Sequence, residues 1–221
     1  MGDIENLKHT DQLLVVRRRE SLETEDGPPL TNHYVIENKA NETVYWAAEG
    51  PAFWARTCFG HNRPFELALL DNQRRKTMVF KRPLFYKSWR FLCRLKRMDI
   101  FAPEGDHVGR IQQGWFFGKP WYVVMNSSGE RILRIEGPWL VFDTFADVKF
   151  NIVEMDGKVV GEIVKTKTGC LWRKAPHHLG ITFSEDMEAN TKAILIGATI
   201  LIDFAVFGNT RRIDLTTLLL M

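Results

Sequence analysis

The chain has 221 residues, of which 45% are hydrophobic and 26% charged, and its formal net charge is +3. This composition is typical of one globular domain and excludes a disordered or collagen-like chain. The cysteines, Cys58, Cys93 and Cys170, are odd in number and widely spaced, which excludes a disulfide framework and a paired zinc-ligand pattern and favours a reducing compartment.

Residues 1–28 form a polar N-terminal segment. It ends in "ETEDGPPL", whose acidic run and Gly-Pro-Pro punctuation predict a linker, and only "DQLLVV" has the pattern of a folded element. It has no apolar signal region, and Asn6 stands where a myristoylation motif requires Ser or Thr, so neither secretion nor myristoylation is expected. We expect a short flexible segment over 1–28, the main domain over 29–210 and a C-terminal tail over 211–221.

From Tyr34 onward the sequence predicts many short antiparallel strands. Runs such as "HYVIEN", "TVYWAA", "FELALL" and "VKFNIVEM" are separated by turn residues, and "WYVVMNSSGERILRI" predicts a hairpin. A set of five residues also recurs 52 positions later, which indicates a repeated strand-turn-strand unit: Ile100, Gly105, Val108, Gly109 and Ile111 return as Ile152, Gly157, Val160, Gly161 and Ile163.

The stretch between Asp71 and Asp99 contains no acidic residue and forms a basic segment with interleaved aromatics. Its cations are Arg74, Arg75, Lys76, Lys81, Arg82, Lys87, Arg90, Arg94, Lys96 and Arg97. Because aromatics settle at lipid headgroups and cations attract anionic lipid, we predict membrane contact by Lys81, Arg82, Lys87, Trp89, Arg90, Phe91, Arg94, Lys96 and Arg97. The alternatives are an ordinary barrel rim with its aromatics turned inward and, less favoured, a surface that binds single-stranded nucleic acid.

No motif for covalent catalysis occurs in the chain: it has no Gly-x-Ser-x-Gly elbow, no His-Glu-x-x-His and no phosphate loop. The adjacent His177 and His178 are expected to be surface residues rather than a metal pair. The carboxylates Glu185, Asp186 and Glu188 cluster ahead of a predicted helix, where they favour its positive dipole end; residual cation binding is the alternative.

The run "AILIGATILIDFAVF" predicts a helix over 193–207 that is apolar on every face except at Asp203. Fifteen residues cover roughly 22 Å, short of the ~30 Å hydrocarbon layer, so a membrane span is the weaker interpretation. We expect the core helix of a closed sheet, with Asp203 bonded to a backbone amide or a basic partner. The core residues are Ile194, Ile196, Ile200, Leu201, Asp203 and Phe204.

From about Asp11 to Gly208 the chain resembles the phospholipid scramblase family. The resemblance rests on the order of "NHYVIENKANETVYWAAE", "RPFEL", "VGRIQQGW", "IEGPW", "DVKFNIVEMDGKVVGEIVKTKTG" and "LGITF" leading into "KAILIGATILIDFAVF". It implies a mainly β, tubby-like fold: a closed antiparallel barrel of about twelve strands around one central hydrophobic helix. It also implies ATP-independent, bidirectional movement of phospholipids across a bilayer without covalent catalysis.

The resemblance further implies partners and modifications. An anionic phospholipid membrane is the expected partner, at the cytoplasmic face and chiefly the plasma membrane, with a nuclear pool; transport would call for an oligomer. Cys93 stands where the family's palmitoylated cysteines cluster. The family's calcium loop would fall on 175–186, where Ala175 and His177 replace acidic ligands, so calcium dependence is doubtful. A proline-rich arm is almost absent, so PxxP partners are not expected. The alternative function is a lipid- or nucleic-acid-binding interaction module.

Overall fold

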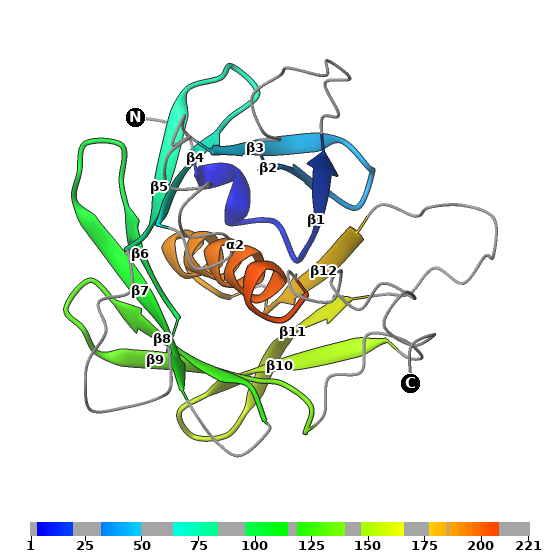
Figure 1. Ribbon diagram of the computed structural model, residues 1–221, viewed down its shortest axis with the longest axis vertical. Coiled ribbons are helices and arrows are strands. Elements are labelled where there is room, and N and C mark those ends of the chain that lie inside the picture. Colours follow the sequence, from blue (N-terminus) through cyan, green and yellow to red (C-terminus); the bar gives the residue numbers. More distant parts are fainter. Residues whose placement is uncertain are drawn as a thin grey trace, which may run out of the picture.

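The computed structural model describes residues 4–19, 32–49, 64–83, 96–114, 119–139, 147–165, 177–184 and 186–207. These residues form a closed barrel of twelve antiparallel strands around one helix (Figure 1). The strands are β1 (Gln12–Arg19), β2 (Asn32–Glu37), β3 (Thr43–Glu49), β4 (Phe65–Leu70), β5 (Lys76–Arg82), β6 (Arg97–Phe101), β7 (His107–Gly114), β8 (Trp121–Asn126), β9 (Arg131–Glu136), β10 (Val148–Glu154), β11 (Val159–Lys165) and β12 (His177–Phe183). The predicted fold class is therefore confirmed.

Each strand pairs with its neighbours in sequence, and β1 closes the barrel by pairing with β12. One consequence corrects the predicted domain boundary, because β1 lies within the segment 1–28 that the sequence placed ahead of the main domain. The short 3-10 helix η1 (Glu5–Leu7) precedes this strand and packs on the central helix, and Leu7 is fully buried. The barrel therefore includes residues well before position 29.

The two ends of the barrel differ in their connections. At one end, here called the turn end, short turns 38–42, 71–75, 102–106, 127–130 and 155–158 join consecutive strands. At the other, here called the far end, the connections run through 20–31, 50–63, 84–95, 115–118, 140–146 and 166–176, which lie outside the described residues. The turn end and the far end therefore alternate along the chain as the strands reverse direction.

The predicted repeat is confirmed as two equivalent hairpins, β6–β7 and β10–β11. Each has a register shift one residue after the repeated isoleucine, between Ile100 and Phe101 and between Ile152 and Val153. Each turn also holds its glycine at positive φ, 104° at Gly105 and 98° at Gly157, a conformation that disfavours a β-carbon. The predicted β8–β9 hairpin is likewise present.

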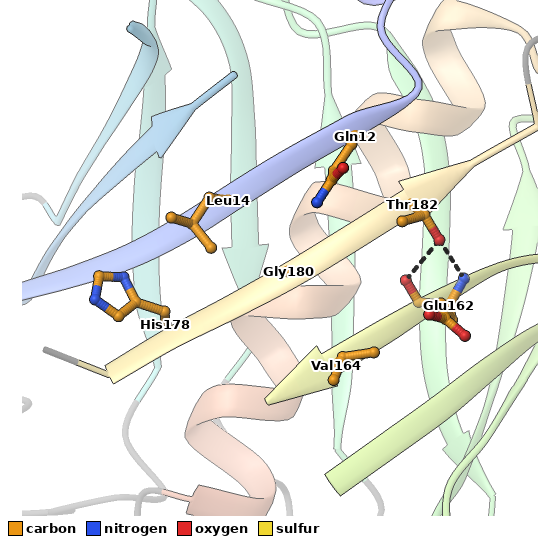
Figure 2. A pocket seen from close by; sticks show the side chains of 7 residues that line it. All are labelled: Gln12, Leu14, Glu162, Val164, His178, Gly180 and Thr182. Atoms are coloured by element: carbon orange, nitrogen blue, oxygen red, sulfur yellow. Dashed lines mark hydrogen bonds between the residues drawn. The ribbon is translucent and has the colours of Figure 1, made fainter. Parts of the chain in front are cut away.

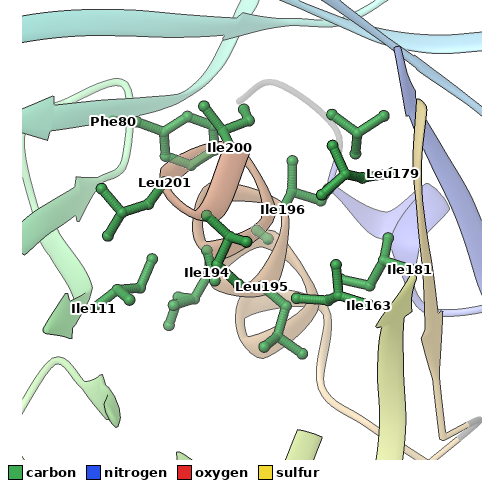
Figure 3. Close-up of a cluster of buried hydrophobic side chains, with 14 of the residues drawn as sticks. Phe80, Ile111, Ile163, Leu179, Ile181, Ile194, Leu195, Ile196, Ile200 and Leu201 are labelled. Carbon is green, nitrogen blue, oxygen red and sulfur yellow. The ribbon is translucent and has the colours of Figure 1, made fainter. Parts of the chain in front are cut away.

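The central helix α2 (Ala189–Ile202) continues into a π-helical turn, η3 (Asp203–Phe207). Figure 3 shows Ile194, Leu195, Ile196, Ile200 and Leu201 among side chains from the surrounding strands, including Phe80, Ile111, Ile163, Leu179 and Ile181. Every residue of α2 from Lys192 to Ile202 is buried. A helix that is apolar all round thus has an apolar protein wall on every side.

The helix begins four residues before the apolar run predicted from sequence, at Ala189. Ala189–Phe207 is therefore 19 residues long with a mean hydropathy of 1.6, the one described helix that could cross a membrane by length and composition. Of its most apolar window, 78% is buried inside the barrel. Six residues for which the sequence predicts a core position are buried in the barrel: Ile194, Ile196, Ile200, Leu201, Asp203 and Phe204.

Lys192 holds the start of the helix at the turn end. Its Nζ donates hydrogen bonds to the carbonyl oxygens of Lys8, at 3.0 Å, and Thr10, at 2.9 Å. These carbonyls lie between η1 and β1, so a buried ammonium group joins the first described residues to the last helix. Two strong charge-assisted hydrogen bonds offset part of the cost of burying this charge.

Candidate functional site

The strand β5 divides the basic segment between the two ends of the barrel. Arg74 and Arg75 lie in the turn 71–75 and Lys76 begins β5, all at the turn end. Arg82 ends the same strand at the far end, about 20 Å away at ~3.3 Å per residue. The ten cations of the segment therefore do not form one patch. Of those that the structure describes, Lys81, Arg82, Lys96 and Arg97 lie at the far end.

Six of the residues predicted to contact lipid or to carry palmitate lie outside the described residues: Lys87, Trp89, Arg90, Phe91, Cys93 and Arg94. The structure describes the four that flank them, Lys81, Arg82, Lys96 and Arg97. Since side chains of a strand alternate between its faces, neighbours in each of these pairs point in opposite directions. Lys81 and Arg97 face outward, and Arg82 and Lys96 face into the barrel.

The two outward cations are paired with acids on the outer surface. Lys81 is exposed, and its Nζ lies 3.4 Å from Glu66 Oε2. Arg97 Nε donates to Asp99 Oδ2 at 2.9 Å. Burial opposes ionisation of Asp99, but hydrogen bonds from Arg110 and Arg97 hold the pKa of its carboxyl below the usual range. The two pairs lie on the outer faces of β5 and β6, the strands on either side of the segment 84–95.

The two inward cations lie beside the end of the central helix. Arg82 is only 2% exposed, and its guanidinium carbon lies 5.5 Å from the ring centroid of Phe65. Lys96 Nζ donates to the carbonyl oxygen of Ala205 at 2.7 Å, within η3. Burial, together with the positive charge of Arg82, lowers the pKa of Lys96 to about 8. The predicted lipid contacts of Arg82 and Lys96 would thus be made from inside the far end.

Asp203 lies at the same end of the barrel. The sequence predicted a backbone amide or a basic side chain as its partner, and in the structure that partner is Arg17. Arg17 Nη1 lies 3.0 Å from Asp203 Oδ2, and the hydroxyl of Tyr34 donates to the same oxygen at 2.7 Å. The ring of Phe204 packs 4.7 Å from that of Phe65 and 5.2 Å from the guanidinium carbon of Arg17. Arg17 and Tyr34 were not among the predicted site residues.

The stretch 175–186, where the resemblance places the family's calcium loop, contains strand β12 over residues 177–183. Its alternation of inward Leu179 and Ile181 with outward Gly180 and Thr182 suits a barrel strand, and β12 pairs with both β1 and β11. The two ends of this strand, at His177 and Phe183, therefore lie at opposite ends of the barrel.

The carboxylates ahead of α2 lie near the turn end, in so far as they are described. Glu185 lies outside the described residues, Asp186 is exposed, and Glu188 is the N-cap of α2 but makes no side-chain capping hydrogen bond. Within the described parts of the chain, no three His, Cys, Asp or Glu side chains come together as a metal-binding group. The binding of calcium at Glu185, Asp186 and Glu188 stays untested.

A pocket of about 320 Å³ opens on the outer face of β1, β12 and β11. Figure 2 shows its lining, in which Gly180 leaves the floor without a side chain between Leu14 and Val164. The Thr182 hydroxyl accepts a hydrogen bond from the Glu162 backbone amide at 3.1 Å. Burial lowers the pKa of His178, although the negative charge of Glu37 acts to raise it. No lining hydroxyl is bonded to a side-chain base, so the pocket does not present an activated nucleophile.

Comparison with known proteins places this barrel in a family. The Scramblase family model matches residues 2–209. Phospholipid scramblase 2 of Bos taurus is 37% identical over 211 residues, which cover 94% of this chain and 72% of the relative. Phospholipid scramblase 1 of Homo sapiens is also 37% identical, over 94% of this chain and 66% of its own length. Phospholipid scramblase family member 5 of Homo sapiens is 31% identical, over 94% of this chain and 78% of its own length.

No solved structure matches the chain significantly. The family assignment therefore rests on sequence, over almost the whole chain, and the barrel accounts for the matched residues from β1 to η3. The chain belongs to the scramblase family.

Proposed function

We propose that this protein moves phospholipids in both directions across a bilayer without ATP. The observation that carries this proposal is the kinship with phospholipid scramblases across 94% of the chain. Such movement makes and breaks no covalent bond, so the proposed activity is transport and not catalysis. It fits a chain without an activated nucleophile in its described pocket.

We propose that the protein attaches to the membrane through the far end of the barrel. The segment 84–95 joins β5 to β6 there, and it carries Lys87, Arg90 and Arg94 together with Trp89 and Phe91. Aromatic rings settle at the headgroup level, and each cation near an anionic surface contributes about 1 kcal/mol. Anionic lipid is enriched in the cytoplasmic leaflet, so we propose the cytoplasmic face of the plasma membrane, with a nuclear pool of unattached protein. A palmitoyl chain on Cys93 would strengthen the attachment.

Transport itself requires a path that lowers the cost of moving a headgroup through hydrocarbon. The central helix cannot line such a path while it fills the barrel, because its side chains pack on the surrounding strands (Figure 3). Withdrawing it would separate Arg17 from Asp203 and leave two buried charges without each other. We therefore propose that closed barrels act from the membrane surface, as an oligomer that thins the bilayer locally.

Calcium is proposed to be dispensable for this activity. A calcium ion takes six to eight oxygen ligands, and the acidic positions of the family's loop are occupied by Ala175 and His177 in this chain. His177 begins β12, and the carboxylates Asp186 and Glu188 follow the other end of that strand. They would have to bind calcium without the residues that precede the strand.

Reconstitution of the purified protein into liposomes tests the proposed function. Liposomes carrying a headgroup-labelled phospholipid are treated with dithionite, which quenches only the label in the outer leaflet. Scrambling predicts that quenching rises from about half of the label towards all of it, with and without calcium. Quenching that stays at half in liposomes shown to contain the protein would contradict the proposal. Repeating the assay over a range of protein-to-lipid ratios tests the oligomer, since transport by single barrels would scale linearly from the lowest ratio.

A further inference from the structure

Four cationic side chains from four separate parts of the barrel gather inside its far end. Arg17 lies on β1, Arg82 at the end of β5, Lys96 just before β6 and Lys165 at the end of β11. We call these four residues the inner cation ring. Their inward direction follows from the register, since Arg17 is opposite Tyr34, Arg82 opposite Phe65 and Lys165 opposite Val148, all of which are buried.

The inner cation ring surrounds the end of the central helix. Arg17 is bonded to Asp203, Lys96 donates to the carbonyl oxygen of Ala205, and the Nζ of Lys165 lies 3.7 Å from the ring centroid of Phe207. The turn η3 supplies one carboxylate, Asp203, and that carboxylate already accepts hydrogen bonds from Arg17 and Tyr34. The helix terminus adds a partial negative charge of about one half. Among the residues that the structure describes, these four cations and the carboxylate of Asp203 are therefore gathered around the end of the helix.

Tyr122 on β8 adds a hydrogen-bond donor to the same space. It is fully buried, and its hydroxyl has no hydrogen-bond partner among the residues that the structure describes. Burial raises the pKa of Tyr122, and the nearby positive charge of Arg82, one member of the inner cation ring, opposes that rise. A buried hydroxyl without a partner is costly, and in native proteins such a group points to a ligand or an ordered water.

We propose that the inner cation ring and Tyr122 bind a phosphate group at the far end of the barrel. A phosphate has several acceptor oxygens, which suit the hydroxyl of Tyr122, the ammonium of Lys96 and the planar guanidinium of Arg82. Lys96, Ala205 and Val206 are half-buried, so this end of the barrel is open to solvent at its edge. The inference goes beyond the proposed function, because it concerns a binding site and holds whether or not lipids are moved.

The phosphate can come from a lipid headgroup or from a soluble phosphate. The ligand chemistry is the same in both cases, and the two sources differ in whether acyl chains must stay in a bilayer. Three probes therefore separate them: inorganic phosphate, soluble glycerophosphoserine, and vesicles of phosphatidylserine in phosphatidylcholine. Binding of the soluble probes is followed by calorimetry on the whole protein, and binding of vesicles by flotation.

The decisive variant is Tyr122→Phe, which removes one hydroxyl and leaves the ring in place. Because that hydroxyl has no described partner, the variant should unfold at the same urea concentration as the wild type without ligand, or at a higher one. Its affinity for a soluble phosphate should fall about tenfold, the loss of one hydrogen bond to a charged group. Tyr45→Phe is the matched control, because Tyr45 is equally buried but lies near the start of β3, at the turn end. It should leave phosphate affinity unchanged.

The possible outcomes distinguish a lipid headgroup from a soluble phosphate, and they include results that would overturn the inference. A loss in Tyr122→Phe for soluble probes and vesicles alike identifies a headgroup, and a loss for soluble probes alone identifies a soluble phosphate. Equal phosphate affinity in the wild type, Tyr122→Phe and Lys96→Met, or no affinity in the wild type, overturns the inference. None of these results depends on dithionite quenching, so a protein that fails to scramble would contradict the proposed function and leave this site standing.

Discussion

Arg17 and Asp203 form a buried ion pair, 3.0 Å between Nη1 and Oδ2, that joins the first strand of the barrel to the last turn of its central helix. The two residues are 186 positions apart in the sequence. Their pairing holds the helix at the far end, as Lys192, bonded to the carbonyls of Lys8 and Thr10, holds it at the turn end. Both contacts attach the helix to the N-terminal residues, so β1 and α2 stabilise each other.

The first prediction concerns this ion pair. Asp203→Asn should lower the free energy of unfolding by about 3 to 5 kcal/mol, because it leaves the guanidinium of Arg17 buried without its carboxylate. The double variant Arg17→Met, Asp203→Leu should recover most of the loss, since it removes both buried charges. Urea denaturation followed by circular dichroism measures both.

An exposed ion pair on the same barrel is the control for this prediction. Glu66→Gln breaks the contact with Lys81, where both side chains are about half exposed, and should change the free energy of unfolding by less than about 1 kcal/mol. A loss as small for Asp203→Asn as for Glu66→Gln would show that Asp203 is not buried with Arg17 in solution.

The second prediction concerns packing of the helix within the barrel. Leu201 is fully buried, so Leu201→Ala should cost about 2 to 5 kcal/mol of unfolding free energy through the cavity that it leaves. Val159→Ala on the exposed side of β11 should cost less than about 0.5 kcal/mol. Equal and small losses in the two variants, together with lipid-phase labelling of residues 194–206, would favour a helix in the membrane over one in the barrel.

The sequence predicted the architecture where it depends on alternation and on apolar periodicity. Hairpins such as β8–β9, the repeat that ends in Gly105 and Gly157, and the buried helix are all local patterns, and the structure confirms them. The place of β1 could not be predicted in this way. In the sequence, Arg17 is one of several charged residues in a polar segment that was predicted to be a linker. Nothing near it in the sequence indicates that it points inward and pairs with Asp203.

The candidate site was predicted less well, because the order of charged residues in the sequence does not show which of them lie close together in the fold. The basic segment includes the whole of β5, whose length separates Arg74 from Arg82 and whose alternation turns Lys81 outward and Arg82 inward. Lys165 and Tyr122 lie far from this segment in sequence and were not predicted at all. They lie at the same end of the barrel as Arg82 only because the twelve strands close into a barrel.

The third prediction follows from the pKa of Lys96, which is lowered to about 8 by burial and by Arg82. Below pH 8 the folded and unfolded states are both protonated, and burying the charge destabilises the fold. Between pH 8 and about 10.4, the ordinary pKa of lysine, only the unfolded state still binds the proton, so stability should rise with pH. The wild type should gain up to about 2 to 3 kcal/mol over this range relative to Lys96→Met. A constant difference between the two proteins from pH 7 to pH 10 would contradict it.

The fourth prediction is that calcium binds weakly or not at all. Ala175 and His177 supply no carboxylate, and the described carboxylate Asp186 is exposed near the other end of β12. Calorimetric titration of the whole protein should give no isotherm in the micromolar range. A micromolar isotherm that Asp186→Ala abolishes would show that the carboxylates ahead of α2 form a calcium site after all.

The last prediction concerns membrane attachment by the far end. Binding to phosphatidylserine liposomes should weaken steeply as salt rises, because exposed cations attract an anionic surface only within a Debye length of about 8 Å at physiological ionic strength. A variant with Lys87, Arg90 and Arg94 changed to Ser should float poorly even at low salt. The matched control changes Arg74, Lys76 and Lys158 to Ser, which removes the same charge from exposed positions at the turn end. Since both variants lose three positive charges, a general effect of net charge would weaken them equally, whereas attachment through the far end weakens only the first.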